Sequence, residues 1–241
     1  MHSAEKNPPR RRKMSSFDYV RSNYLNLLSE IEDLGKKAGR EVTLVAVTKS
    51  GSDEELMALA RAGAGNIGEN RPGELRRKGE LLTEAGYTPK LHEIGNLQRN
   101  KVKLIIDRVD LIHSLDSIAL AEEIEKWAKK IGRKIRVLIE INSGHEEQKG
   151  GVLPEDAEEF LLALQKFSHI EVAGLMTMGP VCEDAEGLRP YFRETKDLFD
   201  RLNAGYGFVG GILSMGMSDS YVVAIEEGAT MVRVGRKLFK S

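Results

Sequence analysis

Lys49 is a candidate for covalent chemistry with an aldehyde. It closes an otherwise apolar run, residues 42–49, in which no other side chain offers its ammonium a partner. Desolvation in such a run disfavours the charged ammonium, and only the neutral amine can attack an aldehyde. The alternative is a lysine whose stem lies along a strand while its head reaches water. This segment alone favours that alternative, whereas the rest of the chain favours the reactive amine.

Two segments near the C-terminus are candidates for binding a phosphate. Residues 214–220 contain hydroxyls and a glycine and lead into an expected helix, whose free N–H groups and dipole favour an anion. Residues 233–236 follow the last expected strand, and Gly235 lets the backbone approach a ligand closely. An N-cap at Ser218 and a turn at Gly235 would explain each segment alone. Their joint occurrence indicates a phosphate site.

Short apolar segments alternate with polar-faced helical segments, a pattern typical of an α/β protein with parallel strands. Eight strands are expected, at residues 42–49, 66–69, 90–95, 110–115, 134–142, 170–178, 212–217 and 230–235. Seven helices are expected between them, near residues 53–62, 71–84, 100–107, 117–131, 154–167, 185–203 and 218–227.

An eighth helix is expected at residues 17–37, where apolar residues recur at helical spacing before Gly39. Only six residues follow Gly235, so this N-terminal helix must complete the outer ring. The elements therefore predict a single (βα)8 TIM barrel domain over residues 17–241. An open doubly wound sheet is the alternative architecture.

A barrel of this kind places the active site at the carboxyl ends of its strands and commonly binds phosphate after strands seven and eight. Lys49 ends the first strand, which lies beside the eighth when the barrel closes. The expected ligand therefore combines an aldehyde with a phosphate. Pyridoxal phosphate has this composition, and a phosphorylated sugar that forms an imine, as in class I aldolases, has it as well.

Arg233 favours pyridoxal phosphate. If Arg233 and Met231 point into the barrel, Val232 and Val234 face the helices, as the alternation of a barrel strand requires. A guanidinium that faces a pyridine nitrogen donates to it and leaves it unprotonated, which makes the cofactor a poor electron sink. The alternative is a salt bridge inside the barrel to a carboxylate, either Glu69 or Glu140.

Composition excludes several classes of protein. The chain has 36 Lys and Arg against 37 Asp and Glu, a net charge of -1, so we expect no nucleic-acid or membrane binding through a global field. Its single cysteine, Cys182, excludes an internal disulfide and suits a reducing compartment such as the cytoplasm. Its five histidines lie far apart, and no metal site is expected.

Residues 1–16 are expected to form a disordered basic tail that contains Arg10-Arg11-Arg12-Lys13. No apolar stretch follows that could serve as a signal peptide or membrane span. Binding of RNA or a partner protein through this run is an alternative function, and it would be sensitive to salt.

Six ordered motifs between about Phe17 and Phe239 carry a resemblance to a known family. They are VAVTK (45–49), IGEN (67–70), HEIGNLQRNK (92–101), GLMTM (174–178), LSMGMS (213–218) and VRVG (232–235). With these motifs the chain resembles the pyridoxal phosphate homeostasis proteins, the YggS/PROSC group, whose fold is similar to the barrel domain of alanine racemase.

The resemblance implies a role for particular residues. Lys49 would carry pyridoxal phosphate as an imine, Arg233 would face the pyridine nitrogen, and Asn70 would lie near the ring. The phosphate would be held by residues after strands seven and eight, namely Ser214 or Ser218 with the backbone of Gly235 and Arg236. The mouth of the site would be lined by His92 and Met176.

Four positions depart from the family pattern. Glu93 stands where an aromatic residue is usual, Ser220 where Asp is usual, and Lys240 where Gly usually follows Phe. Arg236 replaces a threonine that binds phosphate in many members, so a hydroxyl contact is lost there. The backbone N–H remains, and the guanidinium can add charge-assisted contacts.

The resemblance implies a protein that binds, buffers or delivers this vitamin B6-derived cofactor, with no robust reaction of its own. A one-base amino-acid racemase is the alternative, and a class I aldolase is a weaker one. Alanine racemase takes its second base from a further β domain, which this chain is not expected to build. The expected partners are pyridoxal phosphate and the apo-enzymes that accept it, and the protein is expected to be a monomer.

Overall fold

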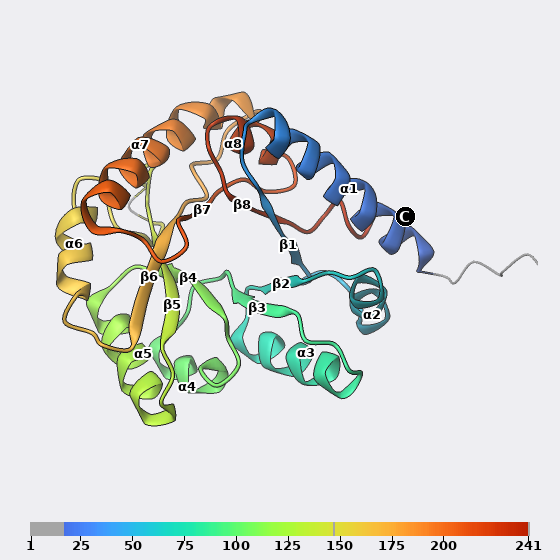
Figure 1. Cartoon of the computed structure of the whole chain (residues 1–241), viewed down its shortest axis with the longest axis horizontal. Coiled ribbons are helices and arrows are strands. Elements are labelled where there is room, and N and C mark those ends of the chain that lie inside the picture. Colours follow the sequence, from blue (N-terminus) through green and yellow to red (C-terminus); the bar gives the residue numbers. More distant parts are fainter. Residues whose placement is uncertain (1–16, 147, 241) are drawn as a thin grey trace, which may run out of the picture.

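The computed structural model describes residues 17–146 and 148–240, and eight parallel strands form its closed barrel. Neighbours in the barrel follow the order of the sequence, and β1 pairs with β8 (Figure 1). The strands are β1 (Thr43–Val47), β2 (Asn66–Glu69), β3 (Lys90–Glu93), β4 (Leu111–Leu115), β5 (Ile135–Glu140), β6 (Ile170–Met176), β7 (Ile212–Ser214) and β8 (Met231–Val234). The predicted TIM barrel is confirmed, and the open sheet is excluded.

Helices surround this barrel. They are α1 (Asp18–Lys37), α2 (Asp53–Arg61), α3 (Pro72–Glu84), α4 (Val102–Ile105), α5 (Ile118–Ile131), α6 (Ala157–Leu164), α7 (Arg189–Tyr206) and α8 (Tyr221–Glu226). Two 3₁₀ turns, η1 (Arg99–Lys101) and η2 (Glu186–Leu188), precede α4 and α7. The expected helix near 100–107 is therefore one short turn of 3₁₀ helix followed by one turn of α-helix.

The N-terminal helix completes the outer ring, as predicted. Helix α1 packs against both α2 and α8, the first and last helices that follow strands (Figure 1). The side-chain amide of Asn23 donates to the carbonyl oxygens of Leu238 and Lys240, at 3.2 and 2.8 Å. These bonds attach the C-terminal segment to α1 and close the seam of the ring.

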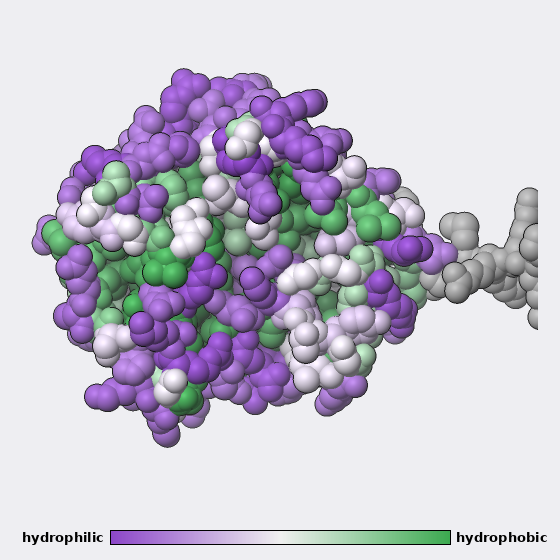
Figure 2. Space-filling view, in the orientation of Figure 1, coloured by the Kyte–Doolittle hydropathy of each residue, from purple (hydrophilic) through white to green (hydrophobic). Residues whose placement is uncertain are grey.

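The strands alternate between two apolar layers. In β8, Val232 and Val234 pack in the layer between strands and helices, whereas Met231 belongs to a separate cluster inside the barrel. Val45 of β1 lies in the inner cluster and is paired in register with Arg233. The predicted inward orientation of Arg233 is therefore confirmed. Figure 2 shows hydrophilic side chains around the outer edge of the ring and over parts of its middle, with hydrophobic ones between them.

Several strands are shorter at their carboxyl ends than the sequence pattern predicted. Strand β1 ends at Val47, β6 at Met176 and β7 at Ser214, because the residues that follow turn into the loops above the barrel. The expected basic tail, residues 1–16, lies outside the described residues. Within the described ranges, no helix has the length and apolar character needed to cross a membrane.

Candidate functional site

A cavity of about 430 Å³ opens at the carboxyl ends of the strands. Six of the nine predicted site residues line it, namely Lys49, Asn70, Ser218, Arg233, Gly235 and Arg236. The loops after β1, β2, β7 and β8 therefore converge as the barrel rule predicts. The sequence analysis missed other residues of the wall, among them Asn96, Glu140, Lys149, Met178 and Met217.

Lys49 projects from the first residues of the loop after β1 and is exposed. It has no hydrogen-bond or ion-pair partner within the described residues. The expectation that Lys49 is desolvated by an apolar strand is wrong, because β1 ends two residues earlier and Lys49 is exposed. Its ammonium is instead free to meet a ligand in the cavity.

Two asparagines also present unpartnered amides to this cavity. Asn70 and Asn96 make no hydrogen bond within the described ranges, and both line the wall. Gly95 permits this arrangement, since a Cβ on Gly95 would lie 2.4 Å from the carbonyl oxygen of Asn70. Together with Lys49, these side chains provide donors and acceptors that a polar ligand can satisfy, which fits a cofactor with an aldehyde, a ring hydroxyl and a phosphate.

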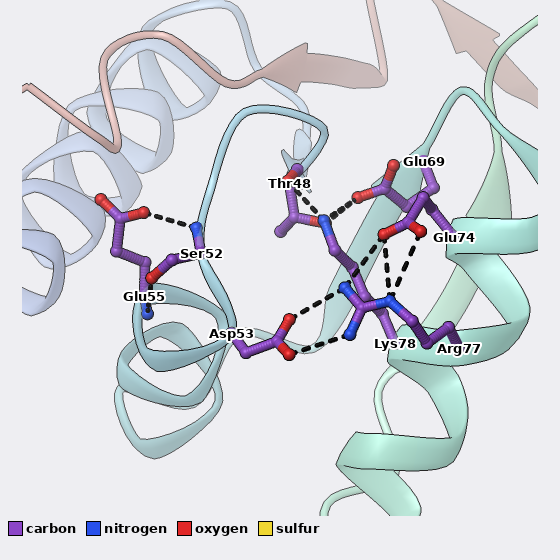
Figure 3. A network of polar contacts seen from close by, with 8 residues as sticks. All are labelled: Thr48, Ser52, Asp53, Glu55, Glu69, Glu74, Arg77 and Lys78. Atoms are coloured by element: carbon purple, nitrogen blue, oxygen red, sulfur yellow. Dashed lines mark hydrogen bonds and ion pairs between the residues drawn. The ribbon is translucent and has the colours of Figure 1, made fainter.

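A buried polar network holds the backbone just before Lys49 (Figure 3). The ammonium of Lys78, from α3, donates to the carbonyl oxygen of Thr48 and to Oε1 of Glu69, each at 2.6 Å. The Thr48 hydroxyl donates to the same Glu69 oxygen at 2.6 Å. These three side chains are at most 3% exposed. The network fixes the direction in which the chain leaves β1, and hence where Lys49 begins.

The far end of the same loop is also fixed. Ser52 caps α2 in a capping box, in which its hydroxyl accepts from the Glu55 N–H and the Glu55 carboxylate accepts from the Ser52 N–H. Arg77 of α3 forms two bonds of 2.9 Å with the carboxylate of Asp53 (Figure 3). The loop that bears Lys49 is therefore held by α3 at both of its ends, through Lys78 before Lys49 and through Arg77 after it.

Arg233 lies at the floor of the cavity and is 4% exposed. Its Nη1 donates to the hydroxyl of Ser214 at 2.6 Å, and its Nη2 donates to the carbonyl oxygen of Thr177 at 3.0 Å. Burial lowers the pKa of Arg233 to about 10, and the nearby Glu140 opposes this shift. The guanidinium therefore remains charged at neutral pH and acts only as a donor.

The alternative role of Arg233 in a salt bridge is not supported. Within the described residues, Arg233 forms an ion pair with neither Glu69 nor Glu140. Glu69 points toward the helices and pairs with Lys78 at 2.6 Å. Arg233 is held instead by neutral acceptors, which leaves its charge available to a ligand.

Glu140 is a buried carboxyl group in the cavity wall that the sequence analysis did not assign to the site. Burial raises its pKa to about 7, the charge of Asp116 adds to the shift, and Arg233 opposes it. Glu140 is the last residue of an apolar strand, as the sequence suggested for Lys49. Applying the same positional criterion to every strand would have identified it.

The segments after β7 and β8 meet at Ser218 and Gly235. The Gly235 N–H donates to the Ser218 hydroxyl at 3.3 Å, and a Cβ on Gly235 would lie 3.0 Å from the carbonyl oxygen of Val47. Helix α8 starts at Tyr221 and its N-cap is Ser220. This excludes the alternative in which Ser218 serves only as the N-cap of that helix. The Arg236 guanidinium pairs with Asp219, and both side chains are largely exposed.

Three predicted site residues lie below the cavity. His92, Met176 and Ser214 were expected to line the mouth or bind phosphate, but they are 2%, 1% and 0% exposed. Their side chains point into the barrel interior, where Met176 packs in the inner apolar cluster. Ser214 binds Arg233 and His113, so it supports the cavity floor. The expectation that His92 and Met176 line the mouth is wrong, since inward residues of short strands fill the interior layers. Of the two serines offered for the phosphate, only Ser218 lines the cavity.

Glu93, one of the departures from the family pattern, is fully buried beside the site. Its Oε1 accepts from the Gly95 N–H at 3.2 Å, and its Oε2 has no hydrogen-bond partner within the described part of the chain. Burial raises the pKa of Glu93 to about 8, and the neighbouring Glu69 adds to this shift. A carboxyl group here is therefore protonated at neutral pH.

Comparison with known proteins places the chain in a family. Residues 23–241 match the family described as "Alanine racemase, N-terminal domain". A pyridoxal phosphate homeostasis protein of Aquifex aeolicus is 42% identical over 216 residues, 88% of this chain and 94% of that protein. One from Helicobacter pylori (strain ATCC 700392 / 26695) is 35% identical over 218 residues, 89% of this chain and 95% of that protein.

Solved structures agree with this assignment. PipY of Synechococcus elongatus PCC7942 with PLP bound superposes with a TM-score of 0.79 at 28% identity, covering 92% of this chain and 100% of that one. An alanine racemase of Clostridium difficile 630 shares the fold, with a TM-score of 0.73 at 20% identity over 93% of this chain and 60% of that one. The chain is therefore a member of the pyridoxal phosphate homeostasis protein family, within the larger family of alanine racemase N-terminal domains.

Proposed function

We propose that this protein binds pyridoxal 5'-phosphate in the cavity above the barrel and serves in the homeostasis of that cofactor. The observation that carries the proposal is the position of Lys49, an exposed lysine without a partner among the described residues, in the same cavity as Arg233. Relatives up to 42% identical are named pyridoxal phosphate homeostasis proteins, and the PipY structure contains PLP.

Each end of the cofactor has a proposed partner in this chain. Lys49 provides the amine that attaches the aldehyde, and Arg233 donates to the pyridine nitrogen. The phosphate is held by Ser218, the backbone at Gly235 and the guanidinium of Arg236. Asn70 lies beside the ring. When bound, pyridoxal phosphate supplies an electrophilic aldehyde and an electron-withdrawing ring.

Arg233 supports a binding role over a catalytic one. A permanently charged donor leaves the pyridine nitrogen unprotonated, and such a ring stabilises a carbanion poorly. No tyrosine lines the cavity among the described residues, so the site lacks the phenol that could act as a second base in racemisation. The residues therefore favour holding and releasing the cofactor.

The same proposal includes the destination of the cofactor. Attachment through a lysine is reversible, so the amine of an acceptor can displace Lys49 and take the cofactor away. The acceptors that fit are apo-enzymes that depend on pyridoxal phosphate. We place this exchange in the cytoplasm, because the chain has one cysteine and no internal disulfide.

Mass spectrometry of the borohydride-reduced holoprotein tests the proposal. The expected result is one covalent adduct on the peptide that contains Lys49. Lys149 provides the matched control, because it is a second lysine in the wall of the same cavity. An adduct that persists in Lys49→Ala and disappears in Lys149→Ala would contradict the assignment.

A further inference from the structure

Five hydrogen-bonded side chains cross the inside of the barrel, and we call them the barrel series. It consists of Asn66, His92, His113, Ser214 and Arg233. The contacts in that order are Asn66 Oδ1 to His92 Nε2 at 3.1 Å, His92 Nδ1 to His113 Nε2 at 3.0 Å, His113 Nδ1 to Ser214 Oγ at 3.1 Å, and Arg233 Nη1 to Ser214 Oγ at 2.6 Å.

The barrel series connects the two ends of the barrel. Arg233 lines the cavity at the carboxyl ends of the strands, while Asn66 and His92 line a second cavity of about 400 Å³ at the amino ends. The two histidines and Ser214 are at most 2% exposed. Water therefore has little access to the middle of the series, and the side chains must satisfy one another.

The chemistry of the members sets a single direction for every hydrogen bond. The carbonyl oxygen of Asn66 accepts, so His92 carries its proton on Nε2 and accepts at Nδ1. His113 must then donate from Nε2, which leaves its own Nδ1 as an acceptor. The Ser214 hydroxyl donates to that nitrogen, and its lone pairs accept from Arg233.

The opposite direction leaves groups unsatisfied. If His113 donated from Nδ1, Ser214 would receive protons from both His113 and Arg233, and its own buried hydroxyl proton would lose its acceptor. A proton added to Nδ1 of His92 would place two N–H groups face to face, 3.0 Å apart, and a proton added to Nδ1 of His113 would face the proton of the Ser214 hydroxyl. Burial also lowers the pKa of His92 to about 3 and that of His113 well below its usual range. Both histidines are therefore neutral, with the proton on Nε2.

We propose that His113, supported by His92, is a positioning residue for Arg233. By accepting a hydrogen bond from the Ser214 hydroxyl, Nδ1 of His113 turns the oxygen lone pairs toward Nη1 of Arg233. Thr177 holds Nη2 through its carbonyl oxygen, so the plane of the guanidinium is fixed at two nitrogens. The remaining N–H groups of Arg233, which lines the cavity, would then be available to the pyridine nitrogen of the bound cofactor. This inference rests on the proposed function for its effect on the ligand.

His113→Leu removes the acceptor while keeping a side chain of similar size, and His113→Gln can restore an acceptor. In His113→Leu the Ser214 hydroxyl turns, and Arg233 loses its fixed orientation. We expect the affinity for pyridoxal phosphate to fall about three- to tenfold. We also expect the absorbance of the bound cofactor to become sensitive to pH between 6 and 8, with partial recovery in His113→Gln.

A matched control separates positioning from general destabilisation. His169→Leu removes a partly exposed histidine that pairs with Glu125 outside the site. It should lower the melting temperature and leave the spectrum of the bound cofactor unchanged. If His113→Leu likewise changes only the melting temperature, the positioning role is refuted.

Nitrogen-15 NMR of the histidine rings tests the barrel series without any cofactor. In the cofactor-free full chain, His92 and His113 should both be neutral with the proton on Nε2 from pH 6 to 8. A charged ring or a proton on Nδ1 would overturn the inference. If the lysine adduct fails to form but these tautomers are found, the proposed function fails and the hydrogen-bond series stands. If the adduct forms and the tautomers differ, the inference alone fails.

Discussion

The ammonium of Lys78 lies 2.6 Å from the carbonyl oxygen of Thr48, the residue immediately before Lys49. Lys78 is 3% exposed, and its only carboxylate partner within the described residues is Glu69, which is 1% exposed. A buried charge therefore supports the one loop whose amine is proposed to hold the cofactor. This contact joins α3 to the end of β1 and makes the position of Lys49 depend on packing behind it.

Replacing Lys78 by Met should destabilise the protein by roughly 3–5 kcal/mol, because Glu69 would remain buried without its counter-charge. The loss of the donor to Thr48 should also weaken covalent attachment of pyridoxal phosphate. Urea unfolding and the absorbance of the loaded protein measure the two effects. Lys36→Met is the control, since Lys36 is 74% exposed and its ion pair with Asp33 should contribute less than about 1 kcal/mol. Equal effects of the two variants would contradict the role of Lys78.

Lys49→Ala should abolish the absorbance of the lysine-bound cofactor and leave the fold intact. Lys49 is exposed and makes no polar contact within the described ranges, so its loss should change the free energy of unfolding by no more than about 0.5 kcal/mol. Absorbance titration with pyridoxal phosphate and urea unfolding give the two readouts. Lys149→Ala should retain the absorbance. A Lys49→Ala protein that still forms the adduct would show that another lysine carries the aldehyde.

Substitutions at Arg233 and Arg236 should affect the ring and the phosphate of the cofactor separately. Arg233→Glu places a carboxylate at the pyridine nitrogen, which favours its protonation and should shift the spectrum of the bound cofactor. Arg236→Gln removes a proposed phosphate contact and should weaken binding about three- to tenfold with no spectral shift. Titration followed by absorbance records affinity and spectrum together. An unchanged spectrum in Arg233→Glu would refute its contact with the ring.

The stability of the protein should depend on pH through Glu93. Its folded pKa, about 8, lies above the ordinary value of 4.5, so the folded state holds a proton that the unfolded state releases between these values. The contribution of Glu93 to the free energy of unfolding is therefore largest below pH 4.5 and declines as the pH rises toward 8. The slope for one proton approaches 1.4 kcal/mol per pH unit, as an approximate upper limit.

Glu93→Gln removes this titration. The free energy of unfolding of the variant, relative to that of the unmodified protein, should rise steadily from pH 5 to pH 8.5. Urea unfolding at a series of pH values measures the difference. Glu183→Gln is a suitable control, because Glu183 is exposed in the loop after β6. A difference between Glu93→Gln and the unmodified protein that does not vary with pH would show that Glu93 is ionised in the folded state.

The sequence by itself determined the architecture and the general place of the site. Eight apolar segments alternating with helices predict a barrel, and a parallel barrel gathers the carboxyl ends of its strands at one face whatever the details of packing. The positions of Lys49, Ser218, Arg233, Gly235 and Arg236 along the chain therefore predict that they share one cavity, and the resemblance to the family adds Asn70.

Tertiary structure decided which side chains reach the cavity and what supports them. Lys78 appears in the sequence as one of many helical lysines, and only its contact with Glu69 and Thr48 shows that it is buried. His92 and Ser214 follow the same inward alternation as Arg233, yet they join a series beneath the cavity. These outcomes depend on distances between residues far apart in the chain, which strand periodicity does not encode.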